Sequence, residues 1–415
     1  MNKLTRNIFI FILVIIFIMA FSSSYFSLSM DNLAYVLAIG IDKSDENKLK
    51  VSFQFSTTSP VAESGSTKKA PSVIDTVEAS SLSNAINLMN NYLSKQVNMS
   101  HCKVIIFSEE LAKEGISSEI YTLINDTQVR PSSNIVITKT DANYYMQKTQ
   151  PQLENLIAKY YEIFTNSSEY TGFMPNATIG EFFNTLICKE CEPFAILGGV
   201  IASNSQNDQS SNSSSTNNAQ RDYSIKSSHS PISGETDSEN IGVAVFKGDT
   251  LVGELDALET ISFLSIKNKA DRFLISIPDP TTSNSYIDIY MTPENTTQIK
   301  VDTKTGSPYI QVSLRFTGRI YSMENNENYL KPEVLELISD SCDSYLESTF
   351  SNFLYKTAKE FHSDILGFGK SASSNFFTIE DFENYNWLDS YQDSFFDVDV
   401  NTSIKSSMLI TETNS

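Results

Sequence analysis

Cysteine, histidine and tryptophan are scarce in this sequence. Its 415 residues include four cysteines, three histidines and one tryptophan. Cysteines this few and scattered cannot form a disulfide framework in a chain of this size, so packed apolar side chains must stabilise the fold. A content of 40% hydrophobic and 11% aromatic residues is enough for such cores. The length allows two or three domains, and the composition indicates a globular protein.

Basic residues are also in deficit. The chain has 30 lysines and arginines against 50 aspartates and glutamates, which gives a formal net charge of −20. A charge of this sign repels nucleic acid and anionic lipid headgroups. The net charge therefore disfavours a role in nucleic-acid binding.

Two of the cysteines have the C-x-x-C spacing that redox and metal sites use. They are Cys188 and Cys191, separated by a lysine and a glutamate. A zinc site would need two further ligands, and the chain offers only His101, His229 and His362 as imidazoles. The alternative is two unreactive cysteines that happen to be close in sequence, and this interpretation is favoured.

The amino terminus resembles an export signal. Lys3 and Arg6 precede an apolar run at 8–21 that has no polar side chain. The run is short for a full span, but the mild residues 22–28 can extend it. Residues 20–24 match the cleavage site of a secretory signal peptidase only weakly. We therefore expect residues 1–30 to remain as an uncleaved signal anchor. Basic residues before the run place the body of the chain on the extracytoplasmic side.

The first half alternates between strand and helix patterns. Apolar runs at 33–40 and 49–55, joined by a charged turn, predict a hairpin. An amphipathic helix is predicted at 82–93, with further helices at 109–113, 120–124, 153–164 and 179–186. Short apolar strands are predicted at 104–107 and 135–137. Strands that alternate with helices indicate a mixed α/β domain, which we assign to residues 31–200.

Residues 201–240 differ in composition from the rest. Serine, asparagine, glutamine and aspartate dominate, so we predict a flexible linker or insertion. Strand patterns resume at residue 241. The predicted strands are residues 242–246, 251–255, 273–277, 286–290, 299–301 and 309–316. These predict one meandering antiparallel sheet. A long helix is expected at 333–361, ended by Gly367 and Gly369, with a last strand at 396–400.

Together these patterns predict a multidomain α+β protein. After the anchor we expect a mixed α/β domain at 31–200, the linker, and a domain at 241–405. In this second domain, long helices pack on an antiparallel-rich sheet. Residues 406–415 form a tail.

Several segments, in order, resemble the C subunits of spore germinant receptors, the GerC family. They are 32–42, 100–115, Arg130 with the strand at 135–137, 241–255, the run from Asp364 to Gly369, and Trp387 with Val398 and Val400. The resemblance covers some 370 residues. It implies a lipoprotein on the outer face of the spore inner membrane that works with GerA-type and GerB-type membrane subunits.

This chain departs from the family pattern in one respect. No cysteine follows the apolar run, so lipid attachment at a conventional lipoprotein site is chemically impossible. The apolar run itself can then serve as the anchor. The Ser/Asn-rich segment is longer than the family requires and is interpreted as a tolerated surface insertion.

Other polar groups are better explained by structure than by catalysis. His101 and Cys102 are adjacent, and neighbouring strand residues point to opposite faces, so they cannot form a nucleophile and base pair. Asp42, Asp45 and Glu46 lack the spacing of a calcium loop and are expected in a solvated turn. The acids at 393–399 are expected on the wet face of a strand. Gly367 and Gly369 follow a helix, whereas a phosphate-binding loop precedes one.

We therefore expect a non-catalytic receptor subunit that acts in assembly or signalling of the complex during germination. The alternative is an extracytoplasmic solute-binding protein that captures the nutrient directly. An exported hydrolase finds no supporting set of residues. No catalytic, cofactor-binding, metal-binding or lipidated residue is assigned, no cofactor is expected, and the sequence does not indicate ligand-binding residues.

Overall fold

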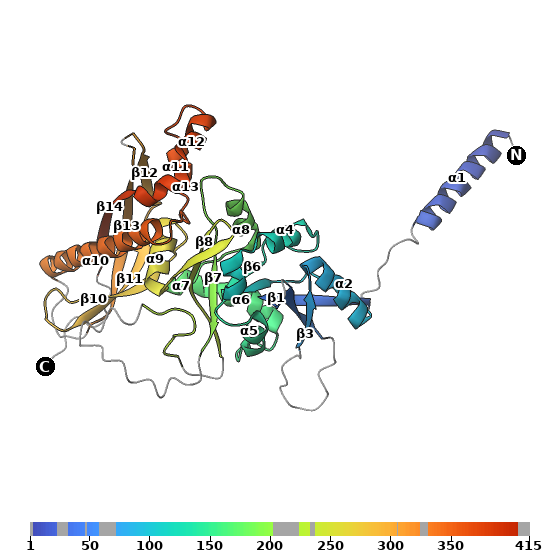
Figure 1. The fold of residues 1–415 in the computed structure, drawn as a ribbon, viewed down its shortest axis with the longest axis horizontal. Coiled ribbons are helices and arrows are strands. Elements are labelled where there is room, and N and C mark those ends of the chain that lie inside the picture. Colours follow the sequence, from blue (N-terminus) through green and yellow to red (C-terminus); the bar gives the residue numbers. More distant parts are fainter. Residues whose placement is uncertain are drawn as a thin grey trace.

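The computed structural model describes residues 3–22, 32–45, 48–57, 72–201, 224–232, 237–304, 306–323 and 331–405 (Figure 1). Several predicted features lie outside these residues. They are the end of the anchor at 23–30, most of the loop at 60–72, Glu46, most of the Ser/Asn-rich segment and the tail at 406–415.

A nine-stranded mixed sheet forms the first half of the molecule. Its strands lie in the order β3-β2-β1-β5-β6-β7-β8-β9, and β4 pairs with the start of β1. The strands are β1 (Leu33–Lys43), β2 (Leu49–Ser56), β3 (Ser72–Ala79), β4 (Gln96–Asn98), β5 (Val104–Ser108), β6 (Asn134–Thr138), β7 (Phe194–Val200), β8 (Ser238–Lys247) and β9 (Thr250–Leu255). The central strands β1, β5, β6 and β7 run parallel, and antiparallel hairpins flank them on both sides.

The parallel strands β5, β6 and β7 are short and largely apolar because helices cover both faces of the sheet. Every residue of β5, β6 and β7 is buried. The helices of this half are α2 (Leu82–Leu93), α3 (Glu109–Glu114), α4 (Ser117–Asn125), α5 (Ala142–Lys148), α6 (Ile157–Ile163), α7 (Ser168–Thr171) and α8 (Ile179–Leu186). The predicted hairpin and the predicted strands and helices of this half are confirmed, although α6 is shorter than the helix predicted at 153–164.

The assignment of two strands to a separate second sheet is wrong. β8 pairs with β7, with Phe194 opposite Val245, and β9 pairs with β8 at the edge of the first sheet. A hairpin pattern shows that two strands pair with each other, but it carries no information on which sheet they extend. The division of the chain at the Ser/Asn-rich segment stays a prediction.

Part of the predicted linker packs against the first sheet. Ser227 is fully buried, and its hydroxyl donates to the carbonyl oxygen of Leu197 at 2.8 Å. The Ser227 hydroxyl oxygen in turn accepts the N–H of Ile241 at 2.7 Å. The described end of the segment is therefore an ordered part of the fold.

The second sheet has five strands. They are β10 (Phe273–Pro278), β11 (Tyr286–Pro293), β12 (Gln298–Asp302), β13 (Tyr309–Met323) and β14 (Phe395–Lys405). β13 is long enough for β11 and β12 to pair along one of its edges, one after the other. β14 pairs with the other edge and runs parallel to β13. The remaining pairs are antiparallel, so the prediction of an antiparallel-rich sheet is confirmed.

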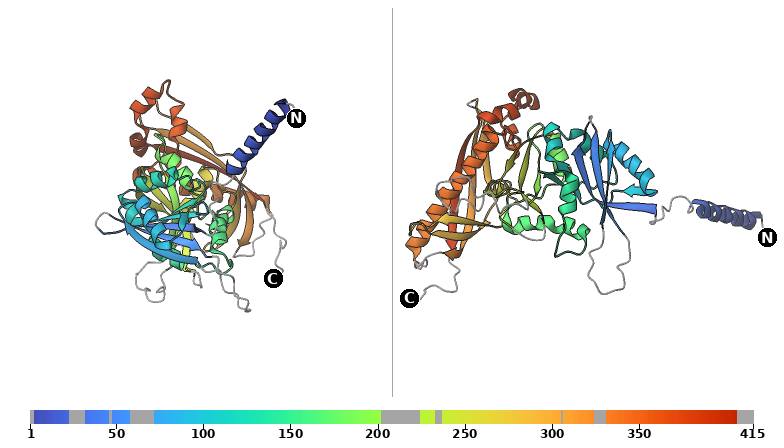
Figure 2. Two further views of the ribbon diagram at one scale, coloured as in Figure 1. Left: turned by 90° about the vertical axis from the view of Figure 1, so that its right-hand side faces the viewer. Right: turned by 60° about the horizontal axis from the view of Figure 1, so that its bottom comes forward.

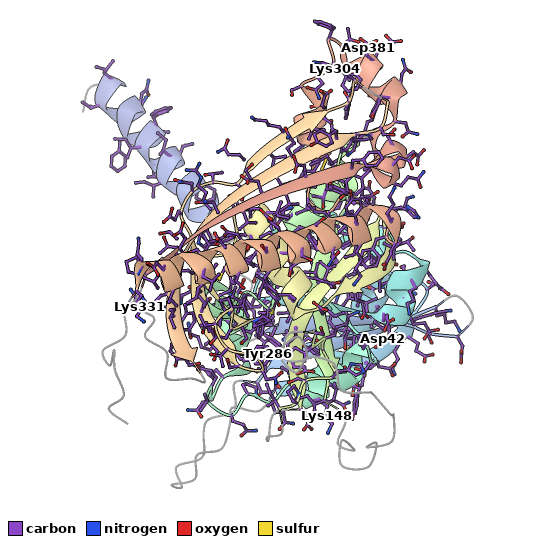
Figure 3. The ribbon with its side chains drawn as sticks, turned by 90° about the vertical axis from the view of Figure 1, so that its left-hand side faces the viewer. Asp42, Lys148, Tyr286, Lys304, Lys331 and Asp381 are labelled. Atoms are coloured by element: carbon purple, nitrogen blue, oxygen red, sulfur yellow. A yellow bond between two sulfur atoms is a disulfide. The ribbon has the colours of Figure 1, made fainter. Side chains whose placement is uncertain are left out.

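One long helix covers one face of the second sheet. α10 (Pro332–Lys359) buries Ile338, Leu346 and Phe350 among others, and it agrees with the helix predicted at 333–361. Figure 3 shows it crossing the strands, with Lys331 at its start. The short helices α9 (Ala257–Ile266), α11 (Gly369–Ser373), α12 (Ile379–Tyr385) and α13 (Trp387–Ser390) complete this half.

Side chains of α10 also protect the free edge of β14. The Glu347 carboxylate accepts the N–H of Val400 at 3.1 Å, and the Tyr355 hydroxyl accepts the N–H of Phe396 at 3.4 Å. Edge strands with unpaired N–H groups invite pairing with other chains. These two contacts remove donors that a foreign strand would need.

The first helix, α1 (Lys3–Ser22), lies apart from both sheets (Figure 2). Its described apolar side chains are exposed, with Phe9 63% and Ile16 60% accessible. Within the part of the chain that the structure describes, no helix is long and apolar enough to span a membrane.

Candidate functional site at the junction of the two halves

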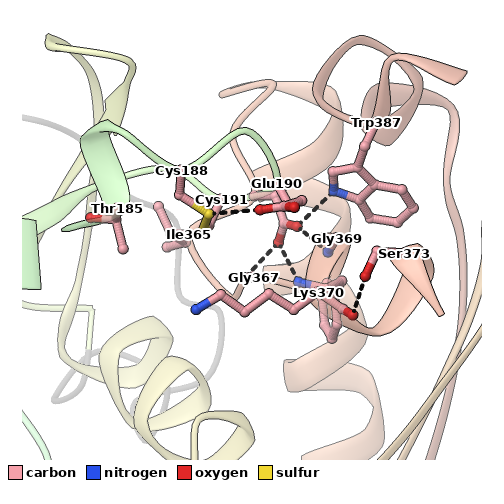
Figure 4. The surroundings of a disulfide bond; sticks show 12 residues. Thr185, Cys188, Glu190, Cys191, Ile365, Gly367, Gly369, Lys370, Ser373 and Trp387 are labelled. Atoms are coloured by element: carbon pink, nitrogen blue, oxygen red, sulfur yellow. Dashed lines mark hydrogen bonds between the residues drawn. A yellow bond between two sulfur atoms is a disulfide. The ribbon is translucent and has the colours of Figure 1, made fainter. Parts of the chain in front are cut away.

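The strongest cluster of buried polar groups lies where the two halves of the chain meet. One side is the loop at 188–193 before β7, together with the turn between β8 and β9. The other side is the segment at 361–369 after α10, together with Trp387 (Figure 4). We call this set the junction.

Asp364 is at the centre of the junction. Its side chain is fully buried. Four N–H groups point at its carboxylate: those of Gly367 at 2.9 Å, Phe368 at 3.1 Å, Gly369 at 2.9 Å, and the indole of Trp387 at 2.8 Å. Burial raises the pKa of Asp364, and the four donors oppose that rise because they favour the charged form. The carboxylate therefore organises the whole segment.

The two glycines of this segment are needed for different reasons, close approach at Gly369 and backbone conformation at Gly367. A Cβ atom at Gly369 would lie 2.3 Å from the Glu190 carbonyl oxygen and 2.6 Å from the Trp387 ring. Gly367 has φ of +76°, a conformation that favours glycine. The prediction that these glycines end the long helix is wrong, because α10 ends at Lys359 and Gly369 begins α11.

Glu192 is a second buried carboxylate, on the opposite side of the junction. It is 4% exposed and accepts the N–H of Gly248 at 2.5 Å. Its own N–H donates to the carbonyl oxygen of Asp364 at 3.2 Å. Desolvation by burial raises the pKa of Glu192 from 4.5 to about 7, and the nearby charge of Asp364 adds to the rise. The protonation of Glu192 therefore changes near neutral pH.

Further contacts join the two halves around these carboxylates. The Ser363 hydroxyl donates to the Phe246 carbonyl oxygen at 2.5 Å. The Lys267 ammonium donates to the Ile365 carbonyl oxygen at 3.2 Å and lies 4.7 Å from the centre of the Phe194 ring. Burial lowers the pKa of Lys267 to about 8. The junction thus connects the first sheet, α9 and the segment after α10.

Cys188 and Cys191 form a disulfide at the edge of the junction. The two cysteines were interpreted as merely close in sequence, whereas the structure joins them in a bond. The pair follows the carboxyl end of α8, where the helix dipole is negative, and the Glu190 carboxylate is 3.1 Å from the Cys188 sulfur. Both features disfavour a thiolate, whereas redox-active pairs stabilise one. The geometry fits a structural disulfide.

The same pair belongs to a group that could in principle hold a metal ion. Cys188, Glu190 and Cys191 place their ligand atoms within 4.8 Å of one another. Sulfurs joined to each other offer no thiolate for a metal. None of the three histidines, all of which the structure describes, belongs to the group.

The residues suspected of chemistry elsewhere have structural surroundings. His101 and Cys102 lie in the turn before β5, and not on the strand as predicted. Their side chains do diverge: His101 is exposed and lies perpendicular to the Tyr35 ring, with the ring centres 5.0 Å apart, while Cys102 is 1% exposed. No hydrogen bond from the His101 side chain appears among the described residues.

The solvated turn predicted for Asp42 is wrong. Asp42 is 3% exposed, and its carboxylate accepts the N–H of Ala142 at 2.6 Å and of Asn143 at 3.3 Å. It therefore caps the first turn of α5 from a distant strand. Desolvation by burial raises its pKa, and the two N–H donors oppose the rise. Asp397 and Asp399 do lie on the exposed face of β14, as expected.

Comparison with known proteins identifies the family. A model of the spore germination protein N-terminal domain matches residues 27–197, and a model of the spore germination B3/GerAC-like C-terminal domain matches 241–408. The chain belongs to the spore germination GerAC family. This family comprises C subunits of germinant receptors and is not a known enzyme family. Membership implies that the chain is membrane-associated and associates with other receptor subunits.

Two relatives of this GerAC-family chain agree with that assignment. Spore germination protein KC of Bacillus subtilis (strain 168) is 22% identical over 377 residues, covering 88% of this chain and 87% of that protein. The crystal structure of the GerBC protein covers 88% of this chain and 96% of its own, with a TM-score of 0.51 and 14% identity. At this identity the structural match shows the fold.

The junction also explains some of the residues on which the resemblance rests. Asp364, Gly367, Gly369 and Trp387 come together around one carboxylate, although 17 residues separate Gly369 from Trp387 in the sequence. Sequence reasoning missed Glu192. Its position directly after the C-x-x-C pair and before Pro193 was the available signal, but its burial depends on distant strands.

Proposed function

We propose that this GerAC-family chain is a non-catalytic subunit of a spore nutrient-germinant receptor, needed for assembly or signalling of the receptor complex. The observation that carries this is the family match on both halves of the chain. In this proposal, a fixed relation between the two halves presents one defined surface to the partner subunits. The buried carboxylates of the junction provide that connection.

We also propose that α1 anchors the chain, with the body on the outer face of the spore inner membrane. The exposed apolar side chains of α1 and the basic residues before them support this orientation. The Cys188–Cys191 disulfide supports it too, because disulfides persist in extracytoplasmic compartments. The partners would be GerA-type and GerB-type membrane subunits.

Co-purification tests the assembly part of the proposal. The full chain with an affinity tag, solubilised from spore inner membranes, is expected to bring down both partner subunits in a constant ratio. The matched control carries residues 1–31 fused to an unrelated soluble domain, which keeps the anchor and removes both sheets. Recovery of the full chain alone, or equal recovery of partners with the control, would show that the folded part does not assemble with them.

A further inference from the structure

A pocket of about 450 Å³ lies between one edge of the first sheet and the segment that joins α5 to α6. The strands β2 and β3 form one side of it. The last turn of α5, the joining segment and the first residue of α6 form the other side. Small-molecule sites usually occupy about 300–1,000 Å³. The pocket therefore has the size of a site for a small molecule.

Hydrogen bonds between the two sides fix the walls of this pocket. The Asn143 amide of α5 donates to the Ser52 hydroxyl at 3.0 Å and to the Thr76 hydroxyl at 2.7 Å, which ties α5 to β2 and β3. The Tyr161 hydroxyl of α6 donates to the side-chain oxygen of Gln54 on β2 at 2.9 Å, and both residues are 2% exposed. The walls are held without a ligand, so binding needs little ordering of the chain.

Part of the pocket lining is aliphatic. Ile74 of β3, Met146 of α5 and Ile157 of α6 contribute to it, together with Pro151. Met146 is 1% exposed, so it belongs to the inner wall and not to the rim. Burial of one CH₂ group contributes about 0.8 kcal/mol. A ligand with an aliphatic chain therefore gains affinity from this part of the lining.

The polar part of the lining offers hydrogen-bond acceptors and one negative charge. Glu154 is the only charged residue among the described residues of the lining. Its half-buried carboxylate has no ion-pair or hydrogen-bond partner within the part of the chain that the structure describes. The Gln147 and Gln150 amides donate their N–H groups to the Asn143 side chain and to the Gln147 carbonyl oxygen. Their own side-chain oxygens are thus available as acceptors.

These groups select the charge of the ligand. A carboxylate or phosphate on the ligand would meet Glu154, and no lysine or arginine among the described lining residues would offset the repulsion. The net charge of −20 raises the local concentration of cations and acts in the same direction. An ion pair that water reaches adds little affinity. Glu154 therefore selects a positive charge, while the aliphatic contacts supply most of the binding energy.

We propose that this pocket binds a small aliphatic ammonium compound. Its charged group lies at Glu154, with the side-chain oxygens of Gln147 and Gln150 as further acceptors. An ammonium group has three donors, which suits these three acceptors. Its chain packs against Ile74 and Ile157. This binding activity goes beyond the proposed role in receptor assembly, and it gives the N-terminal half of the chain a ligand site.

Calorimetric titration of the full chain in detergent tests the proposal, with titrations into detergent alone subtracted. Hexylammonium is the probe, and hexanol and hexanoate are its neutral and anionic counterparts of similar size. We expect saturable binding of hexylammonium, about fivefold weaker binding of hexanol, and no saturable binding of hexanoate. Glu154→Gln should weaken hexylammonium binding about fivefold and leave hexanol binding nearly unchanged, because only the cation uses the charge.

Glu162→Gln is the matched control for the charge. Glu162 is an exposed acid on α6 outside the described lining, so this variant removes the same net charge from the chain. We expect it to change the affinity less than twofold. Ile157→Ala should instead weaken hexylammonium and hexanol by the same factor, about threefold or more, since both ligands bury their chain there.

Each of four results would overturn the proposal. The first is no saturable binding of hexylammonium, and the second is binding of hexanol or hexanoate that is equally tight. The third is equal weakening by Glu154→Gln and Glu162→Gln, which would assign the effect to the overall charge. The fourth is unchanged binding of both ligands in Ile157→Ala, which would place the chain outside this pocket.

Discussion

Replacing Asp364 with asparagine is expected to lower the free energy of unfolding by about 3–5 kcal/mol. Four N–H groups converge on the carboxylate, which accepts all of them. An asparagine has one acceptor oxygen, and its NH₂ group would face donors. Buried donors left without an acceptor are costly, at about 1–3 kcal/mol each.

Trp387 makes this prediction easy to measure. It is the only tryptophan in the chain, and its indole donates to Asp364. Urea unfolding followed by tryptophan fluorescence therefore reports on the junction itself. Asp399→Asn is the control, since this carboxylate is exposed on β14, and it should stay within about 0.5 kcal/mol of the parent chain. A change below about 1 kcal/mol in Asp364→Asn would contradict the role given to the carboxylate.

Raising the pH is expected to destabilise the junction through Glu192. The pKa of Glu192 rises from 4.5 to about 7 in the folded chain, so the folded state binds this proton more tightly than the unfolded state does. The resulting stability is fully present below about pH 4.5 and is lost as the pH rises through 7. A shift of this size corresponds to a contribution on the order of 3 kcal/mol.

The Glu192→Gln variant isolates this contribution. Glutamine is neutral throughout and keeps an oxygen for the Gly248 N–H, so the fall in stability between pH 4.5 and 8 should be smaller in the variant by the Glu192 contribution. Above pH 7 it should be more stable than the parent chain. Unfolding free energies from pH 4.5 to 8 provide the measurement, with Glu190→Gln as the neighbouring control. A parent-like pH profile in Glu192→Gln, or the same flattening in Glu190→Gln, would refute this account.

Local patterns in the sequence predicted most of the individual elements. The helix at 179–186 coincides with α8, and the long helix at 333–361 nearly coincides with α10. Both have an apolar stripe at helical spacing, which depends only on neighbouring residues. The strands at 104–107 and 135–137 are equally local, because short apolar runs form the buried parallel strands β5 and β6.

Long-range relations were not predictable in the same way. The pattern at 242–255 predicted two successive strands, but the pairing of β8 with β7 decides which sheet they join. The neighbours of Asp42 in the sequence predicted a charged turn, yet its carboxylate caps α5, which begins one hundred residues later. The junction was missed for the same reason. Its residues were marked by a family resemblance, whereas their convergence on Asp364 depends on how the two halves pack.

Release of dipicolinic acid from spores tests the central claim most directly. Spores that lack this gene are to be challenged with nutrients and, separately, with a trigger that bypasses the receptors. A receptor subunit predicts loss of a nutrient response, an intact response to the bypass trigger, and recovery when the gene is restored. A normal response to every nutrient, or equal loss of both responses, would contradict the role of this chain as a subunit of the nutrient receptor.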